Sequence, residues 1–413
     1  MKPEQIKSSR DAKNNNINIA ILTTSYPLHS NSSSGIFISR LVEALPASVQ
    51  ASVVTPSSRQ RHHHQTRSPG ISLHCFRYAP FSWQILAHEP GGIPAALDNK
   101  PWLIGLIPTF LLGMSIACLA TSRKSDLIHA NWTICGVIGG IVGKLTRKPV
   151  VTTLRGQDFN RAASSFTYRI LLHGCITLSS YVITVSENMR ADLIKRFPKS
   201  KDRIINIPNG VDDTFLKVPS LATSSNDSTI NILSIGSLTK NKNIDTIIKA
   251  ISNIHNENIK LTLIGDGPER AALEQLAKEC NVGSRVRFKG IQPHSDIPTY
   301  FEKADIFILA SQSEGRPNVV LEAMAAGVPV IASDIPGNRE LITHETTGVL
   351  FSVDHVDELG EKLERLIDAP TKRKRLAAAA KESIIQQRLS WEATGMKYLN
   401  IYMQALSKSS RTS

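Results

Sequence analysis

Two glutamates lie on either side of a predicted helix start in the stretch SQSEGRPNVVLEAMAAGVPVIASD (311–334). The helix is expected over 317–326, because Pro317 is tolerated in a first turn and a glycine follows the last helical position. The backbone N–H groups of Asn318 and Val319 and the positive end of the helix dipole would then form a site for an anion such as a pyrophosphate.

The two carboxylates are spaced so that they can contact one ligand. Glu322 lies one turn after Asn318 on the same helix face, where its oxygens can accept hydrogen bonds from two adjacent ribose hydroxyls. Glu314 lies eight residues earlier, in the loop before the helix, and can approach the other end of that ligand. Taken alone, two glutamates near a helix start are equally consistent with capping and with compensation of the helix dipole.

The segment from Glu314 to Glu322 resembles the E-x7-E signature of the retaining nucleotide-sugar glycosyltransferases of family 4, also called group 1, which have the GT-B fold. The resemblance extends over nearly the whole chain. The other matching stretches, in the family's order, are SSGIF (33–37), DLIHANW (126–132), LRGQD (154–158), VSENM (185–189), IPNGVD (207–212), IGSLTKNKNID (235–245), GDGPER (265–270) and SWEATGMKYLNIY (390–402). The opening SYPLHSNSSSGIFISR is similar to bacterial enzymes that build cell-surface polysaccharides.

The resemblance implies a reaction and its participants. A sugar would move from a UDP- or GDP-sugar to a glycan or a polyprenyl-diphosphate-linked acceptor, with its anomeric configuration retained. It also implies that no divalent metal or other cofactor is required, and that the protein is cytoplasmic, at the inner face of the plasma membrane. No nucleic-acid partner is expected, because no helix-turn-helix or RNA-binding signature accompanies the basic residues.

The resemblance assigns the donor site to one set of residues. They are Gly35, Ser237, Gly265, Gly267, Arg316, Pro317, Asn318, Val319 and Glu322. Gly35 would let the backbone approach the donor diphosphate, and Gly265 and Gly267 would leave room for the nucleoside base. Each of these glycines is also consistent with ordinary turn chemistry.

Three further residues are expected to act on the transferred sugar and its leaving group. Lys242 would neutralise the departing diphosphate, the role that a metal ion plays in other enzymes. Glu314 would orient the sugar, and His129, taken as the end of the strand in the run LIHAN (127–131), would contact it. A buried histidine with satisfied hydrogen bonds is the alternative interpretation of His129.

Two positions qualify this assignment. Ser237 stands where the family usually has an arginine, so Lys242, helped by Lys240 or Arg316, must neutralise more of the charge. Asp158, after the strand-like run at 149–155, is expected on the acceptor side, although it could equally be a loop or cap aspartate.

The elements that position these residues follow a β-strand and α-helix alternation. Strands are predicted at 17–25, 52–56, 127–131, 149–155, 181–186 and 204–208, then at 230–236, 260–267, 285–290, 304–310 and 329–333. This pattern is typical of doubly wound parallel sheets, and it restarts after the polar stretch 217–229. An α/β protein with two Rossmann-like domains facing a cleft is therefore predicted, and the resemblance adds a C-terminal helix that crosses back. The expected domains are 1–212 with 390–413, for the acceptor, and 213–389, for the nucleotide sugar.

Charge separates the two halves of the chain. Of its 413 residues, 1–210 carry 24 basic and 10 acidic side chains, whereas 211–413 carry 24 and 25. The basic half is suited to an anionic partner such as a membrane surface or a lipid diphosphate. Residues 102–120 contain no charged side chain, but prolines and glycines interrupt them, which favours a buried or membrane-touching helix over a membrane span.

The cysteines and the histidine run do not predict a metal site or a disulfide framework. The five cysteines are widely spaced without a CxxC pair, so neither a disulfide framework nor a zinc site is predicted. His62, His63 and His64 lie in a polar loop without a carboxylate partner. Two alternatives remain: a GT-B UDP-sugar epimerase, and a nucleotide-sugar-binding protein without turnover.

Overall fold

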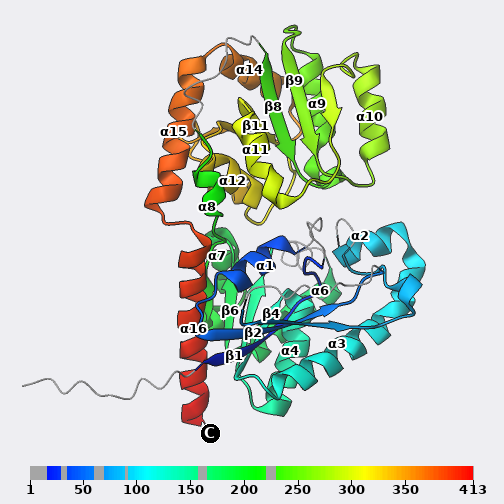
Figure 1. Ribbon diagram of the computed structural model, residues 1–413, viewed down its shortest axis with the longest axis vertical. Helices are drawn as coiled ribbons and strands as arrows, with labels where there is room; N and C mark the ends of the chain where they lie inside the picture. Colours follow the sequence, from blue (N-terminus) through cyan, green and yellow to red (C-terminus); the bar gives the residue numbers. More distant parts are fainter. Residues whose placement is uncertain are drawn as a thin grey trace, which may run out of the picture.

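The computed structural model describes residues 16–28, 35–59, 69–88, 92–156, 165–219 and 229–412. They form two parallel β-sheets, each covered by helices, stacked one above the other along the long axis of the molecule (Figure 1). The predicted α/β class and the two Rossmann-like units are thereby confirmed. Asp158 lies outside the described residues.

The N-terminal sheet has the strand order β3-β2-β1-β4-β5-β6-β7, and every neighbouring pair is parallel. Its strands are β1 (Ile17–Leu22), β2 (Val49–Pro56), β3 (Ile71–Phe76), β4 (Leu127–Asn131), β5 (Val150–Leu154), β6 (Tyr181–Thr184) and β7 (Ile204–Asn206). The central strands are buried on both faces, as a sheet covered by helices on both sides requires.

Helices cover both faces of this sheet. They are α1 (Ile36–Glu43), α2 (Gly92–Asn99), α3 (Ile107–Ser122), α4 (Thr133–Thr146), α6 (Phe166–Leu178) and α7 (Glu187–Arg196), with 3₁₀ turns η1 (Phe81–Trp83), η2 (Pro101–Leu106) and η3 (Pro198–Arg203). The short helix α8 (Asp213–Leu216) instead packs against α12 (Asn318–Ala325) in the C-terminal domain. The turn η2 leads directly into α3, which packs on β1, β2 and β3 and beside α4.

The C-terminal sheet repeats the topology with the order β10-β9-β8-β11-β12-β13. Its strands are β8 (Ile230–Ile235), β9 (Ile259–Ile264), β10 (Val286–Phe288), β11 (Ile306–Leu309), β12 (Val330–Ser333) and β13 (Val349–Phe351). Its helices are α9 (Ile244–Ser252), α10 (Arg270–Glu279), α11 (Ile297–Glu302), α12 (Asn318–Ala325), α13 (Pro336–Arg339), α14 (Val356–Ile367) and α15 (Pro370–Gln386), with 3₁₀ turns η5 (Lys240–Lys242) and η6 (His294–Asp296).

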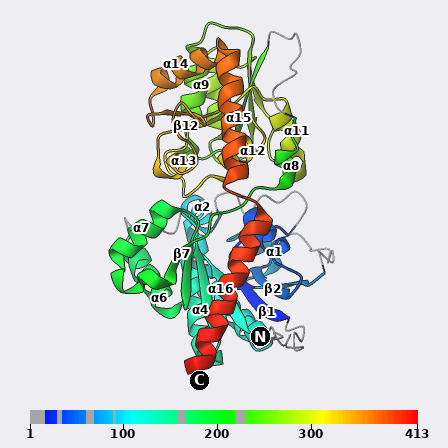
Figure 2. The ribbon, with the colours of Figure 1, turned by 90° about the vertical axis from the view of Figure 1, so that its left-hand side faces the viewer.

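The last helix, α16 (Trp391–Thr412), returns to the N-terminal sheet, as predicted. It packs against α1, β4 and β5, and its Tyr398 and Tyr402 are fully buried in the N-terminal core. Figure 2 shows α15 over the C-terminal sheet and α16 over the N-terminal one.

The chain passes between the sheets twice, and the two passages lie side by side. Val211 bridges to Ser390 in parallel, and its N–H donates to the carbonyl of Leu389 (2.9 Å). A Cβ on Gly210 would come within 2.2 Å of the Ser390 carbonyl carbon, so only glycine allows this close approach. The paired passages are the natural hinge between the two sheets.

Two strands escaped the sequence prediction. β3 is an edge strand in which Ser72 and His74 are exposed at alternate positions, so it lacks the continuous apolar run that identifies a buried parallel strand. β13 is apolar and buried throughout, but its three residues are too few to give a strand pattern.

Candidate functional site

The helix start that was predicted to bind an anion is the start of α12. β11 ends at Leu309, a short loop carries Glu314 and Arg316, and α12 begins at Asn318 with Pro317 at the N-cap. The loop comes from the carboxyl edge of the sheet, where ligands bind in doubly wound folds.

Glu314 and Lys242 meet at this edge. The Lys242 ammonium, which follows β8, forms an ion pair with the Glu314 carboxylate across 72 positions of sequence. Their side chains are 19% and 16% exposed, so both are largely shielded yet still reach solvent. The structure therefore places the predicted diphosphate-binding cation and the predicted sugar-orienting carboxylate in direct contact.

Gly265 and Gly267 have a structural function in this site. A Cβ on Gly265 would lie 1.9 Å from the carbonyl oxygen of Gly236, and one on Gly267 would lie 2.3 Å from that of Leu238. The loop after β9 therefore packs directly on the loop after β8, which carries the half-buried Ser237. This backbone contact, which fixes the course of the chain toward Lys242, explains why both residues are glycines. Space for a nucleoside base is not needed to explain them.

Glu322 is linked to the N-terminal domain through a histidine. Nε2 of His294, in η6, lies 3.1 Å from Oε1 of Glu322, and Nδ1 lies 3.3 Å from a guanidinium nitrogen of Arg40. A neutral His294 with its proton on Nε2 satisfies both contacts, donating to Glu322 and accepting from Arg40. Arg40, in α1, also pairs with Asp212 at 3.1 Å.

Asp212 anchors the other end of this chain of contacts. Burial alone would raise the pKa of its carboxyl group, but hydrogen bonds from Thr214 and the nearby Arg40 charge lower it overall. The charged pair thus links α1 to the hinge segment that precedes α8.

Gly35 lies at the N-terminus of α1, at the carboxyl edge of the N-terminal sheet. Its φ is +73°, and a Cβ there would be 2.4 Å from the Ser25 carbonyl oxygen. Both observations require glycine, so the close approach of Gly35 to Ser25 is sufficient to explain the residue.

The prediction that His129 contacts a sugar is wrong. Its side chain is fully buried, with Nε2 2.9 Å from Thr153 Oγ1 and Nδ1 2.8 Å from the Tyr402 hydroxyl beneath α16. Burial, reinforced by the Arg155 charge, lowers its pKa to about 3, so the ring is neutral. His129 points into the protein because it lies in the middle of β4 rather than at the strand's end.

The end of β4 is occupied by Asn131, which the sequence analysis overlooked. Arg155 donates to its Oδ1 (3.3 and 3.1 Å) and to Oδ1 of Asn209 (3.2 Å), and its guanidinium lies 4.3 Å from the centre of the Phe37 ring. Asn209 in turn donates to Oδ1 of Asn318 at 2.9 Å. A polar network therefore connects the N-terminal sheet edge to the first residue of α12.

Two more contacts join the domains beside this network. The Arg316 guanidinium donates to the Asn209 carbonyl (3.3 Å), and burial lowers its pKa to about 10, opposed by the Glu340 charge. Glu340 accepts hydrogen bonds from the backbone N–H groups of Glu187 (3.1 Å) and Asn188 (2.6 Å), and so caps α7 from the opposite domain. Such long-range partners carry no local sequence signal.

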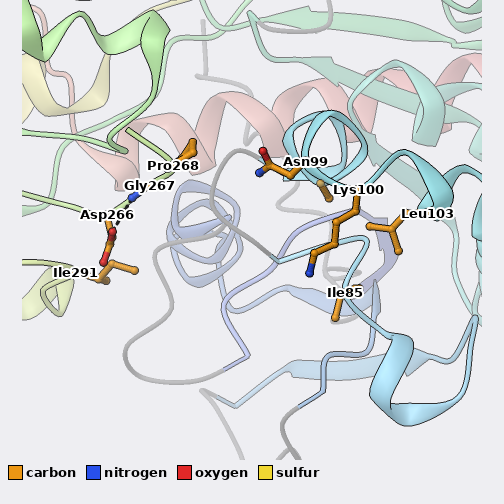
Figure 3. A pocket seen from close by; sticks show the side chains of 9 residues that line it. Ile85, Asn99, Lys100, Leu103, Asp266, Gly267, Pro268 and Ile291 are labelled. Atoms are coloured by element: carbon orange, nitrogen blue, oxygen red, sulfur yellow. Dashed lines mark hydrogen bonds between the residues drawn. The ribbon is translucent and has the colours of Figure 1, made fainter. Parts of the chain in front are cut away.

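A cavity of about 490 Å³ opens between the two domains near these residues. Asn99, Lys100 and Leu103 line it from the N-terminal side, and Asp266 and Gly267 from the C-terminal side (Figure 3). Of the predicted site residues, Gly267 lines this cavity, whereas Lys242, Glu314 and Glu322 lie outside it with their own partners. No group of three or more histidine, cysteine, aspartate or glutamate residues suited to a metal occurs in the described ranges.

Comparison with known proteins gives two family matches that together span most of the chain. Residues 34–215 match the model described as Glycosyltransferase Family 4, and residues 222–383 match the one described as Glycosyl transferases group 1. The chain is 35% identical over 179 residues to the lipopolysaccharide core biosynthesis glycosyltransferase LpsD of Rhizobium meliloti, covering 43% of this chain and 50% of that one.

Solved structures show the same fold. Sucrose-phosphate synthase from Thermosynechococcus elongatus superposes with a TM-score of 0.76 at 22% identity, covering 95% of this chain and 100% of that one. The Anabaena protein Alr3699/HepE, solved in complex with UDP-glucose, gives a TM-score of 0.71 at 20% identity, covering 95% and 100%.

Proposed function

Because the chain belongs to the group 1 glycosyltransferases of family 4, we propose that it transfers a sugar from a UDP- or GDP-sugar to a glycan or a polyprenyl-diphosphate-linked acceptor, with retention and without a metal ion. The observation that carries this proposal is the meeting of Lys242 and Glu314 at the start of α12, with Glu322 on the same helix. One cation and two carboxylates at a helix N-terminus match the parts of a nucleotide sugar: diphosphate, sugar and ribose.

The chemistry follows from charge development. As the bond between the anomeric carbon and the diphosphate oxygen breaks, its electron pair passes to the diphosphate. Lys242 and the backbone N–H groups at the start of α12 stabilise that added charge, and such electrostatic stabilisation usually contributes more to catalysis than any other single effect. The acceptor hydroxyl then attacks the same face of the sugar and passes its proton to the departing diphosphate oxygen, so that an α-linked donor gives an α-linked product.

Donor binding also changes the partners of Lys242. In the structure its ammonium is paired with Glu314, whereas a bound diphosphate would compete for it. The released Glu314 carboxylate would be free to accept hydrogen bonds from sugar hydroxyls. Exchange of one anion for another keeps Lys242 paired in both states, which limits the cost of its burial.

Asn131 takes a positioning role in this proposal. Its Oδ1 accepts from Arg155, and its Nδ2 has no hydrogen-bond partner within the described part of the chain. Through Arg155 and Asn209 it connects the N-terminal sheet edge to Asn318. We therefore propose that it helps to set the position of α12 relative to the acceptor side, where Asp158 is also expected.

A role in cell-surface polysaccharide synthesis, at the cytoplasmic face of the membrane, is supported by two observations. The relative LpsD is named for lipopolysaccharide core biosynthesis. The excess basic charge lies in the N-terminal half, which suits a lipid-diphosphate acceptor.

A transfer assay tests the proposal. The protein is incubated with UDP- and GDP-sugars and polyprenyl-diphosphate-linked saccharides, with and without EDTA, and the new linkage is identified by proton NMR. An α-linked product formed equally with EDTA is expected. Isomerised sugar formed without acceptor would instead identify an epimerase, and nucleotide binding without any product would identify a binding protein, which Ser237 in place of arginine would explain.

A further inference from the structure

The outer side of η2 and α3 is apolar and uncovered. The helical run Pro101–Ser122 is long and apolar enough to cross a membrane by length and composition, yet only 22% of its most apolar window is buried. Its inner side carries Phe110, Met114 and Cys118, each at most 1% exposed and packed in the core of the N-terminal domain. Because that side is fixed to the sheet as the connection from β3 to β4, the run does not span a membrane in this fold.

The exposed residues form one surface, here called the apolar face. It consists of Trp83, Trp102, Ile104, Leu112 and Ile116, continued on the neighbouring α4 by Ile141 and Leu145. Leu112 and Ile116 are 62% and 60% exposed, and Ile104 is 67% exposed. Figure 1 shows α3 and α4 side by side on the outside of the N-terminal sheet, away from α16. Large exposed apolar side chains gathered on adjoining elements of this kind mark an interaction site.

The apolar face ends in a row of basic residues. Both α3 and α4 flank β4 and run opposite to it, so their C-termini lie at the same edge of the sheet. Exposed Arg123 and Lys124 follow α3, and exposed Lys144 and Arg147 lie at the end of α4. Asp126 is the one acidic residue between positions 101 and 148.

We propose that the apolar face and its basic edge dock the N-terminal domain on an anionic phospholipid bilayer. Apolar side chains would enter the boundary between headgroups and acyl chains, while the basic edge contacts anionic headgroups. Trp83 and Trp102, whose rings pack edge to face at 5.7 Å, have the amphipathic rings that favour this interface. A second copy of the chain fits less well, because the same face offers the basic edge no acidic partner between positions 101 and 148 other than Asp126.

The apolar face leads to the cavity between the domains. Leu103 and Lys100, which line that cavity, are close neighbours of Trp102 in sequence. A lipid-linked acceptor would therefore reach the cavity from the docked membrane without leaving its surface. This last step rests on the proposed function, whereas membrane docking itself does not.

Vesicle flotation tests the docking directly. The protein is mixed with vesicles of phosphatidylglycerol and phosphatidylcholine in equal amounts, or of phosphatidylcholine alone. The native chain is expected to float with the anionic vesicles and less with the neutral ones. Leu112→Glu with Ile116→Glu should lower the partition coefficient at least about tenfold, because both side chains lose their burial in lipid. Arg123→Ser with Lys124→Ser should lower it about fivefold per charge removed.

A matched variant controls for the loss of exposed apolar residues. Met396→Glu with Met403→Glu alters two side chains that are 52% and 54% exposed on α16, on the other side of the domain, and should leave flotation unchanged. The proposal would be overturned if the native chain did not float. It would also be overturned if the α16 variant lost as much flotation as Leu112→Glu with Ile116→Glu. A native dimer that Leu112→Glu with Ile116→Glu converts to a monomer in sedimentation velocity would overturn it as well.

A second readout does not depend on any variant. Brominated lipids in the anionic vesicles should quench the tryptophan fluorescence of the native protein, since Trp83 and Trp102 lie in the apolar face. Unquenched fluorescence would count against docking by this face. Neither measurement detects sugar transfer, so a failure of docking and a failure of the proposed function remain distinguishable.

Discussion

At the scale of single residues, the site is a set of competing ion pairs and hydrogen bonds. Lys242 is held by Glu314, and Glu322 is held by His294, so the predicted ligand-binding groups already satisfy one another. A nucleotide sugar would replace these partners one for one. The sequence predicted Lys242, Glu314 and Glu322, because each lies in a motif, but it could not show that two of them pair.

The ion pair gives a sharp prediction for Lys242. Lys242→Met should lower kcat at least about 100-fold, because one preorganised donor to the developing charge is lost. Lys260→Met is the matched control, since Lys260 is an exposed lysine at the start of β9, at the opposite edge of the same sheet. Steady-state transfer rates measure both. Equal rates in the two variants would remove Lys242 from the mechanism.

The two glutamates should separate binding from turnover. Glu322→Ala should weaken nucleotide affinity, whereas Glu314→Ala should reduce kcat more than affinity, because Glu314 is proposed to orient the sugar. Isothermal titration with the nucleotide, combined with kinetics, distinguishes the two effects. Unchanged binding and turnover in both variants would contradict the assigned roles.

His129 predicts a pH dependence of stability. Its folded-state pKa of about 3 lies below the usual 6.5, so the unfolded chain binds a proton that the folded chain does not. The stabilisation is therefore present above pH 6.5 and is lost as the pH falls toward 3, by up to about 1.4 kcal/mol per pH unit. Urea unfolding at several pH values should show a shallower acid slope in His129→Gln. An unchanged slope would mean that the ring is protonated in the folded protein.

At the scale of elements, glycines hold the loops that carry the site. The loop after β9 can approach the loop after β8 because Gly265 and Gly267 lack side chains. The resemblance to the family identified these glycines, and the apolar runs identified the strands around them. The sequence analysis took His129 as the end of the strand, whereas β4 continues for two more residues, to Asn131. All five residues of β4 are buried, so the sequence pattern does not mark the residue at which the strand ends.

Adding one methyl group tests this loop contact. Gly267→Ala places Cβ 2.3 Å from the Leu238 carbonyl oxygen, so the backbone must shift, at a cost of about 1–3 kcal/mol. In Gly283→Ala the nearest atom would be 3.8 Å from the new Cβ, an ordinary contact that serves as the control. Thermal unfolding should show a clear loss of stability for Gly267→Ala only. Equal stability in the two variants would show that the loops are not in contact.

At the scale of the whole molecule, two doubly wound sheets meet across contacts that connect residues more than 100 positions apart. The contacts of Glu340 with the start of α7 and of Asn209 with Asn318 are examples. The sequence predicted both domains and the returning helix α16, because these depend on local patterns and family motifs. The interdomain contacts depend on tertiary placement and could not be predicted.

Glu340 should help to keep the domains together. Glu340→Ala removes the two hydrogen bonds that cap α7 and should increase the radius of gyration in small-angle X-ray scattering. Glu345→Ala is the control, because Glu345 pairs with Lys372 within one domain. If both variants scatter like the native chain, the Glu340 contact does not control closure.

Nucleotide-dependent thermal stabilisation tests the central claim most directly. The native chain, Glu322→Gln and the exposed control Glu302→Gln are heated with UDP, GDP and ADP, with and without EDTA. One nucleotide should raise the Tm of the native chain and of Glu302→Gln regardless of EDTA, and the rise should be smaller in Glu322→Gln. No rise in the native chain, or an equal rise in all three proteins, would contradict a nucleotide-sugar site at α12.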